Sequence, residues 1–166
     1  HEKGFDILFK AIPYVIKENP NVIFAFAGEL KFDYEDFFTE VKEDYDKGKE
    51  YIITLGLLKG QELSDFYTNI DFIVIPSRTD CFNIVQAEAC LAGAPSIVSD
   101  IPGARVLVKE TGFGLIVPQE KDLALALAGM ILKAINEKES FLVKHKNVVE
   151  YLDLDRLLES ARALLA

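Results

Sequence analysis

The sequence predicts an α/β domain in which a doubly wound, mostly parallel sheet carries helices on both faces. Short runs of apolar residues alternate with segments of helical period, and three of these runs end at Gly28, Gly56 and Pro76. Half of the 166 residues are hydrophobic and 27% are charged, which is a globular balance. Apolar strands that alternate with helices are typical of a parallel sheet that is buried on both faces.

The elements follow one another without an internal repeat or a linker, so we expect residues 1–166 to form a single domain. The first helix has apolar residues at close to the helical period, and Pro13 is expected to kink or split it. Helices are expected at 5–18, 32–46, 61–68, 83–91, 103–108, 121–135, 140–151 and 153–165. Strands are expected at 22–27, 51–55, 70–75, 94–98 and 113–117.

The composition of the chain limits which classes of partner it can bind. A formal charge of −9 argues against nucleic acid or an anionic membrane, because both favour basic surfaces. No apolar run reaches the length of a transmembrane helix. Cys81 and Cys90 match neither a disulfide framework nor a zinc pattern, so we expect a reducing, cytoplasmic location. We expect no metal and no cofactor, because no carboxylates or histidines have ligand spacing.

The chain enters a helical pattern directly after His1-Glu2-Lys3-Gly4. We therefore expect the complete protein to have a further strand, and a further domain, before this point.

Ligands of doubly wound sheets bind beyond the carboxyl ends of the strands. The candidate loops are 3–4, 28–29, 56–57, 76–83 and 100–103. The loop 76–83 has the strongest signal, because Pro76 ends an apolar strand and Asn83 can cap the next helix, with Gln86 in the position of a capping box. The free N–H groups of such a helix start bind anions, and a diphosphate would fit there.

Two carboxylates accompany this helix start. Glu88 lies about one turn inside the helix, where it can accept hydrogen bonds from the vicinal hydroxyls of a sugar. Its neighbours are Ala87, Ala89, Leu91 and Ala92, so we expect it to be nearly surrounded by apolar groups and therefore functional. Asp80, at the mouth of the loop, can bind a second sugar in the same way.

The order of these features resembles the group 1 glycosyltransferases. It comprises Asp71, an apolar strand, Pro76-Ser77, an acidic residue, Glu88-Ala89 and Gly93-Ala94-Pro95. The segments on either side of this motif also resemble the family's pattern, so the resemblance covers residues 3–135. The matching positions are Lys3-Gly4, Gly28, Gly56, the segment 99–103 and the segment 111–117. The resemblance implies a retaining enzyme of the GT-B fold, in which two Rossmann-like domains face a cleft. This chain would be the C-terminal, donor-binding domain.

The resemblance also implies roles. Glu88 would bind the ribose, Asp80 the transferred sugar, and Lys3 the diphosphate leaving group; these three are the candidate catalytic residues. Leu57 would pack near the base. The implied nucleotide-sugar site comprises Lys3, Gly4, Gly28, Leu57, Ser77, Asp80, Cys81, Phe82, Asn83, Ile84, Val85 and Glu88. The family's diphosphate-binding arginine would precede this chain. The donor would be a UDP-, ADP- or GDP-hexose. The acceptor would be a sugar or a lipid-linked group, and the other domain would bind most of it. That other domain could also place the enzyme at a membrane surface.

This chain departs from the family's sequence pattern at two places, and these departures leave alternative functions open. The family usually has glutamate where Asp80 stands, and glycine-phenylalanine-glycine where this chain has Cys81-Phe82-Asn83. Losing both glycines changes how closely a sugar can approach the loop. A sugar-nucleotide epimerase or hydrolase of the same fold, or a non-catalytic partner subunit, remains possible.

Ser77 and Arg78 are more often solvated loop residues than ligands, and we expect His145 to be a surface residue and Cys90 a buried one. This chain alone should bind nucleotide weakly and transfer nothing.

Overall fold

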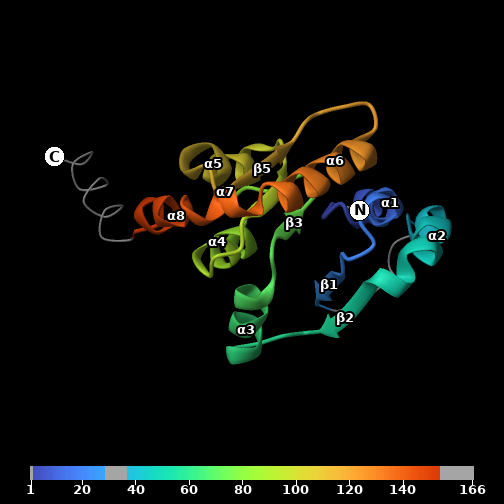
Figure 1. Ribbon diagram of the computed structural model, residues 1–166, viewed down its shortest axis with the longest axis horizontal. Coiled ribbons are helices and arrows are strands. Elements are labelled where there is room, and N and C mark those ends of the chain that lie inside the picture. The colour runs from blue at the N-terminus through green and yellow to red at the C-terminus, as the bar shows by residue number, and fades with distance from the viewer. Residues whose placement is uncertain (1, 29–36, 154–166) are drawn as a thin grey trace.

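The computed structural model describes residues 2–28 and 37–153. Strands and helices alternate along these residues, as the sequence predicts (Figure 1). The strands are β1 (Phe24–Ala27), β2 (Ile52–Gly56), β3 (Ile73–Ile75), β4 (Ser96–Ser99) and β5 (Gly114–Val117). The helices are α1 (Phe5–Glu18), α2 (Phe37–Gly48), the short 3-10 helix η2 (Lys49–Tyr51), α3 (Gln61–Asn69), α4 (Ile84–Leu91), α5 (Pro102–Thr111), α6 (Leu123–Asn136), α7 (Lys138–Leu142) and α8 (His145–Tyr151).

All of the strand pairs are parallel, which confirms the predicted α/β class. The strands do not form one continuous sheet, however. β1 pairs with β2, and β3, β4 and β5 form a second sheet in that order. Figure 1 shows β1 and β2 set apart from the other three strands. The described part of the domain therefore consists of two half-sheets, with β1 and β3 as their facing edges.

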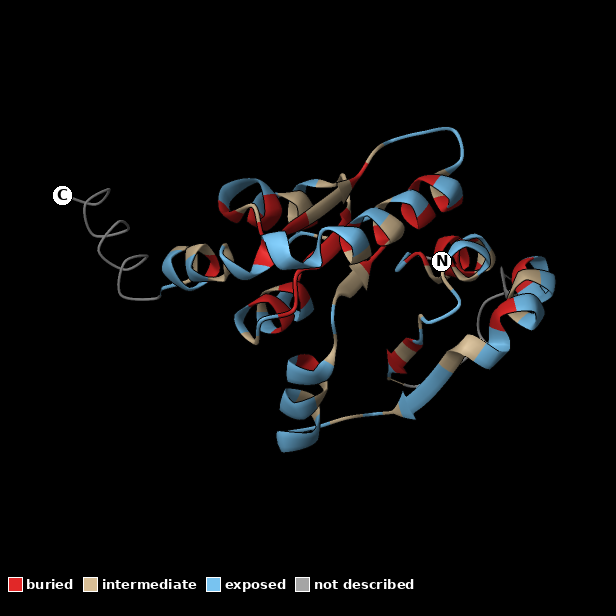
Figure 2. Ribbon diagram, viewed as in Figure 1, coloured by how far each residue is buried: buried red, intermediate tan, exposed pale blue. Residues whose placement is uncertain are grey.

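Helices join the two half-sheets. α1 packs against both α2 and α6, so that one helical layer extends from β1 to β5. Phe9 at the centre of α1 is fully buried and stacks on Phe26 of β1, with the ring centroids 5.6 Å apart. Tyr45 of α2 meets Phe9 edge-on. Figure 2 shows buried residues concentrated where the helices face the strands, while the outer helix faces are exposed.

Three expected elements differ from the structure. Pro13 does not split α1, which continues as one helix because burial of Ile12 and Val15 holds the turns on both sides of the proline against the core. The helix expected at 140–151 is two short helices, α7 and α8. The strand expected at 70–75 is confined to Ile73–Ile75.

Parts of two expected helices, 32–36 and 154–165, lie outside the described residues, as does Glu29 of the candidate loop 28–29. Across 2–28 and 37–153, no helix is long and apolar enough to cross a membrane.

Candidate functional site

The start of α4 is built as the sequence predicts. Asn83 adopts an extended backbone conformation as the N-cap, and its side-chain oxygen accepts the backbone N–H of Gln86 at 2.9 Å. Gln86 does not complete a capping box, which corrects that expectation. Its side chain is buried and donates to the hydroxyl of Ser96 on β4 at 2.9 Å, so it fixes α4 to the sheet. The first helical residues, Ile84 and Val85, remain exposed next to the free N–H groups.

Lys3 and Asp80 meet directly in front of this helix start. The Nζ atom of Lys3 lies 3.3 Å from Oδ2 of Asp80. The side-chain amide of Asn83 donates to the same oxygen at 2.8 Å. The Asp80 side chain is only 13% exposed, whereas that of Lys3 is 64% exposed. The carboxylate is thus fixed and partly neutralised, and the lysine keeps a free side from which it can contact an incoming anion.

A partly buried ion pair holds the same loop in place. Arg78 donates two hydrogen bonds to the carboxylate of Asp6 in the first turn of α1, at 2.7 and 2.6 Å. Burial alone would raise the pKa of Asp6, but the hydrogen bonds and charge of Arg78 lower it below the usual range. The sequence reading of Arg78 as a solvated loop residue is therefore wrong, and Asp6 was not singled out. The available signal was an acidic residue in the first helical turn, close to Lys3.

Two glycines allow the loops to touch. Gly4 has a left-handed backbone (φ 71°), and a Cβ atom there would overlap the carbonyl oxygen of Pro76. A Cβ atom on Gly103 would overlap the backbone of Asp80. Segments 2–4, 76–83 and 100–103 therefore pack against one another, and we call them the loop cluster. The backbone N–H of Arg78 also donates to the carbonyl of Glu2 at 2.8 Å.

Glu88 is exposed rather than nearly surrounded by apolar groups, which corrects the expectation from its neighbours. It lies on the face of α4 that turns toward α3, and its Oε2 accepts a hydrogen bond from the hydroxyl of buried Tyr67 at 3.0 Å. Burial, and then the bond to Glu88, raise the pKa of Tyr67 to about 12. Tyr67 is therefore a permanent donor at neutral pH. It holds one carboxylate oxygen of Glu88 and leaves the other available.

Glu88 shares its surroundings with the ends of β1 and β2. Gly28 donates its backbone N–H to the carbonyl of Gly56 at 2.6 Å, which brings these two strand ends together. Gly28, Leu57, Val85 and Glu88 all line one hollow. We call these four residues and Gly56 the open side, because Leu57 and Val85 are exposed and few polar contacts tie the group together.

The remaining candidates are placed as follows. Ser77 is buried, and Phe82 is 60% exposed. Cys81 is exposed, and Cys90 is buried as the sequence predicts. Burial raises the pKa of the Cys90 thiol to about 11. His145 is half-buried, packs against Phe113 and lies 3.0 Å from the carbonyl of Leu91, so it is not a simple surface residue.

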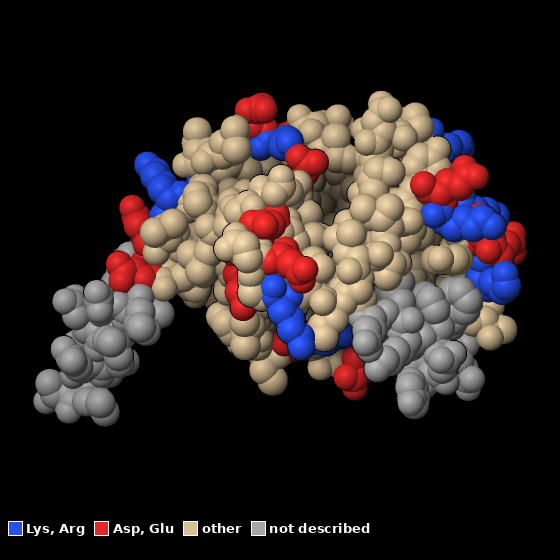
Figure 3. All heavy atoms as spheres, turned by 90° about the horizontal axis from the view of Figure 1, so that it is seen from below, with Lys and Arg blue, Asp and Glu red and all other residues tan. Residues whose placement is uncertain are grey.

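Figure 3 shows one face of the molecule, on which a recess walled mainly by uncharged residues separates two lobes. Acidic and basic side chains gather around this recess.

A family model described as "Glycosyl transferases group 1" matches residues 1–137, most of the chain. The chain belongs to the group 1 glycosyltransferases. The resemblance seen in the motifs is thereby confirmed.

Curated relatives agree with this family. An uncharacterized glycosyltransferase of Methanocaldococcus jannaschii is 30% identical over 125 residues, which are 74% of this chain and 30% of the relative. The gpi3 subunit of phosphatidylinositol N-acetylglucosaminyltransferase from Schizosaccharomyces pombe is 25% identical over 159 residues, 93% of this chain and 34% of the relative. The glycosyltransferase domain described here therefore spans about a third of the length of these relatives.

Solved structures show the same fold. Anabaena HepE in complex with UDP has a TM-score of 0.78 at 21% identity, over 99% of this chain and 45% of that protein. The pneumococcal O-GlcNAc transferase GtfA, in complex with UDP and GlcNAc, has a TM-score of 0.74 at 21% identity, over 98% of this chain and 33% of that protein. The glycosyltransferase domain thus has the Rossmann-like architecture of GT-B enzymes.

Proposed function

We propose that this chain is the donor-binding domain of a retaining glycosyltransferase and that it binds a nucleoside-diphosphate hexose between the loop cluster and the open side. The observation that carries the proposal is that Lys3, from a segment far away in the sequence, meets the capped start of α4, the helix that also carries Glu88. Lys3 and the helix start supply positive groups for a diphosphate, and Glu88 supplies a hydrogen-bond acceptor for a ribose.

The diphosphate is assigned to the loop cluster. The N–H groups at the start of α4 and the ammonium of Lys3 are the positive groups beside it, and Asp80 already holds Lys3 in position. During transfer, the bond between the sugar's anomeric carbon and the diphosphate oxygen breaks, and negative charge collects on the diphosphate. Lys3 and the helix start would stabilise that charge, which is the main requirement for departure of this group. In this proposal the positive field comes from the protein without a metal.

The nucleoside is assigned to the open side. The free oxygen of Glu88 can accept hydrogen bonds from the ribose hydroxyls, while Leu57 offers an apolar surface to the base. Since HepE and GtfA were both solved with UDP, uridine is the first nucleoside to test. Asp80 would contact the transferred hexose. Acceptor binding and full activity would require the other domain, and we place the enzyme in the cytoplasm, with any membrane contact made by that domain.

Calorimetric titration with UDP, ADP and GDP tests this proposal. We expect UDP to bind more tightly than the other two, and Glu88→Gln to weaken its binding by about tenfold, as expected for loss of a charged hydrogen-bond acceptor. Lys3→Ala should weaken UDP binding to a similar extent while leaving the weak binding of uridine unchanged.

Two exposed residues on α5, Lys109 and Glu110, provide matched controls, and Lys109→Ala and Glu110→Gln should bind UDP like the original chain. Absence of binding by all three nucleotides, or equal binding by both site variants and both controls, would contradict the proposal. For the complete enzyme, release or epimerisation of a labelled sugar without any acceptor would contradict transfer as the reaction.

A further inference from the structure

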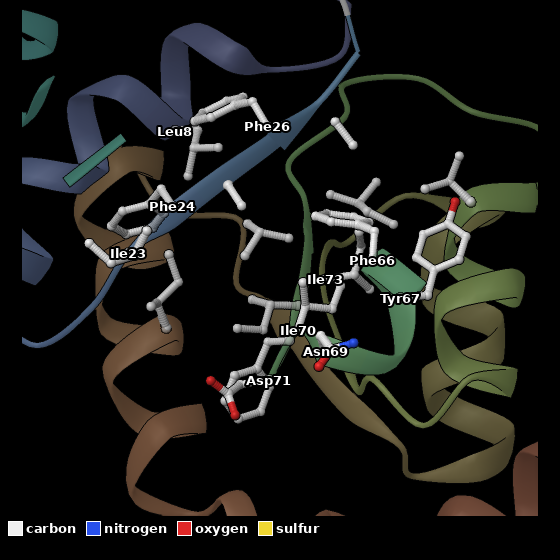
Figure 4. Close-up of a pocket in the computed structure, with 18 of the residues that line it drawn as sticks. Leu8, Ile23, Phe24, Phe26, Phe66, Tyr67, Asn69, Ile70, Asp71 and Ile73 are labelled. Atoms are coloured by element: carbon white, nitrogen blue, oxygen red, sulfur yellow. The ribbon is translucent and has the colours of Figure 1, made fainter. Parts of the chain in front are cut away.

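A second pocket, of about 310 Å³, opens at the carboxyl ends of β3, β4 and β5. It lies between these strands and the helices α1 and α6, which contribute Ile7 and Leu127 to its walls. Figure 4 shows the larger hollow, between Leu8 of α1 and Phe66 of α3, and within the described residues the two spaces share no lining residue. Because doubly wound sheets bind their ligands at the carboxyl ends of the strands, the second pocket is a separate candidate site.

Two serine hydroxyls line this pocket. Ser77 follows β3 by two residues, and Ser99 ends the neighbouring strand β4. Ser77 is only 2% exposed, and neither hydroxyl has a hydrogen-bond partner among the described residues. Every enclosed polar side-chain atom in this part of the chain does have a partner, so the Ser77 hydroxyl must open into the pocket. A ligand that pairs with both hydroxyls would therefore satisfy groups that the protein leaves unpaired.

The rest of the pocket is aliphatic and offers no free charge. Arg78 is the one charged residue among the described residues that line it, and both of its terminal nitrogens already donate to Asp6. A charged ligand would thus meet apolar walls without a free counter-charge, which is costly. The aliphatic lining consists of Ile7, Pro76, Ile101, Val117, Leu123 and Leu127.

We propose that this pocket binds one uncharged sugar unit. The vicinal hydroxyls of a sugar both donate and accept hydrogen bonds, as do Ser77 and Ser99, and the amide of exposed Gln119 can do the same at the edge of the pocket. The C–H groups of the sugar ring would pack against the aliphatic walls. The volume lies at the lower end of the range for ligand pockets, which suits a monosaccharide unit rather than a nucleotide.

A free monosaccharide and the sugar end of a longer acceptor would present the same groups to this pocket. The pocket adjoins the loop cluster, because Pro76, Ser77, Arg78 and Ile101 belong to both. A sugar held here would therefore lie beside the loop that carries Asp80, which suits an acceptor. That role rests on the proposed function, whereas the binding of a sugar does not.

Titration of this chain with uncharged methyl glycosides, followed through the backbone amides by NMR, tests the proposal. The probes are the methyl α-glycosides of glucose, mannose and galactose. We expect at least one of them to shift the amides of Ser77, Ser99 and Val117, with millimolar affinity. Glucose 6-phosphate is the charged control and cyclohexanol the apolar control, and both should bind more weakly. Absence of binding by all three glycosides, or equal binding by either control, would overturn the proposal.

Variants of the lining separate this pocket from the donor site. Ser99→Ala should weaken glycoside binding by about fivefold, as expected for loss of one neutral hydrogen bond. Leu123→Trp, at the half-buried start of α6, should block the pocket. Ser140→Ala, on an exposed position of α7, is the matched control and should bind the glycoside unchanged.

Both lining variants should bind UDP like the original chain, which also shows that they are folded. Loss of UDP binding by the original chain with intact glycoside binding would contradict the proposed function and leave this inference standing. Equal glycoside affinity of Ser99→Ala, Leu123→Trp and Ser140→Ala would overturn the inference instead.

The complete enzyme distinguishes the two sources of the sugar. With a labelled UDP-hexose, an acceptor site would glycosylate the bound methyl glycoside. In that reaction a hydroxyl of the probe bonds to the anomeric carbon, UDP leaves, and the hydroxyl proton passes to the departing diphosphate. Binding without glycosylation would overturn the acceptor role in favour of a free sugar. Binding by this chain but not by the complete enzyme would mean that the other domain fills the pocket, and would overturn the proposal.

Discussion

The loop cluster and the open side lie at the same edge of the fold but are built in different ways. In the loop cluster, Lys3, Asp80 and Asn83 are joined by short polar contacts, and Arg78 and Asp6 hold the adjoining segments. On the open side, one hydrogen bond from Tyr67 fixes Glu88, and Leu57 is exposed. The difference indicates that the groups assigned to the diphosphate are already in position, whereas the groups assigned to the nucleoside are only partly held before a ligand arrives.

The largest expected effect separates two glycines with the same backbone conformation. Gly4 in the loop cluster and Gly56 on the open side have φ values of 71° and 70°, but only Gly4 has backbone packed against it. Gly4→Ala should lower the free energy of unfolding by about 3 kcal/mol, because strain and overlap add. Gly56→Ala should lower it by about 1 kcal/mol, from backbone strain alone. Urea denaturation measures both, and equal losses would show that the loop cluster is not rigid.

The next effect concerns the ion pair beneath the loop cluster. Asp6→Asn should lower the free energy of unfolding by about 2 kcal/mol, because it removes the carboxylate charge that pairs with Arg78 in a half-buried position. Glu62→Gln is the matched control, since Glu62 occupies the first turn of α3 and is exposed. It should change the stability little.

The ion pair also predicts a pH dependence. The pKa of Asp6 is lowered in the folded protein, so its contribution is present above the ordinary aspartate pKa of 3.8 and is lost as the pH falls below it. The original chain should therefore lose its stability advantage over Asp6→Asn in that acid range. An advantage that stays constant from neutral pH to well below 3.8 would contradict the assignment.

A smaller effect is expected on the open side. Tyr67→Phe removes the hydroxyl that holds Glu88 and should weaken UDP binding by about fivefold, which corresponds to the loss of about 1 kcal/mol from one hydrogen bond. Tyr14→Phe, on an exposed position of α1, is the control. The Tyr67→Phe effect should largely disappear in a Glu88→Gln background, because the two residues act through one contact. Additive losses would mean that Tyr67 acts elsewhere.

The smallest effect is expected at Leu57. Because its side chain is 60% exposed, Leu57→Ser should change the free energy of unfolding by less than about 0.5 kcal/mol. UDP affinity should fall by a few-fold while pyrophosphate affinity stays unchanged. A loss of pyrophosphate affinity would show that the open side and the loop cluster are not separable.

Much of the fold was predictable because it depends on local patterns. The strand that ends at Pro76, the cap at Asn83 and the buried face of α1 all follow from residue types at short spacing. The break between α7 and α8 and the short β3 were missed, because both depend on packing against distant elements. That Pro13 does not split α1 also depends on packing, since Ile12 and Val15 beside it are fully buried.

The candidate site shows the same division. Lys3, Asp80, Asn83 and Glu88 were all identified from sequence, and the structure brings the first three together. The exposure of Glu88 was predicted wrongly, because its small apolar neighbours on α4 do not report which face of the helix meets the core.

The sequence by itself determined the α/β class, the order of the elements and the loops that carry the candidate groups, because these depend on periodicity, turn residues and caps along the chain. Only the tertiary structure decided that Arg78 pairs with Asp6, that Tyr67 holds Glu88, and that the sheet is divided between β1 and β3. Each of these facts joins residues separated by at least 20 positions or depends on strand pairing. No local pattern records such contacts, because they arise only when the chain is folded.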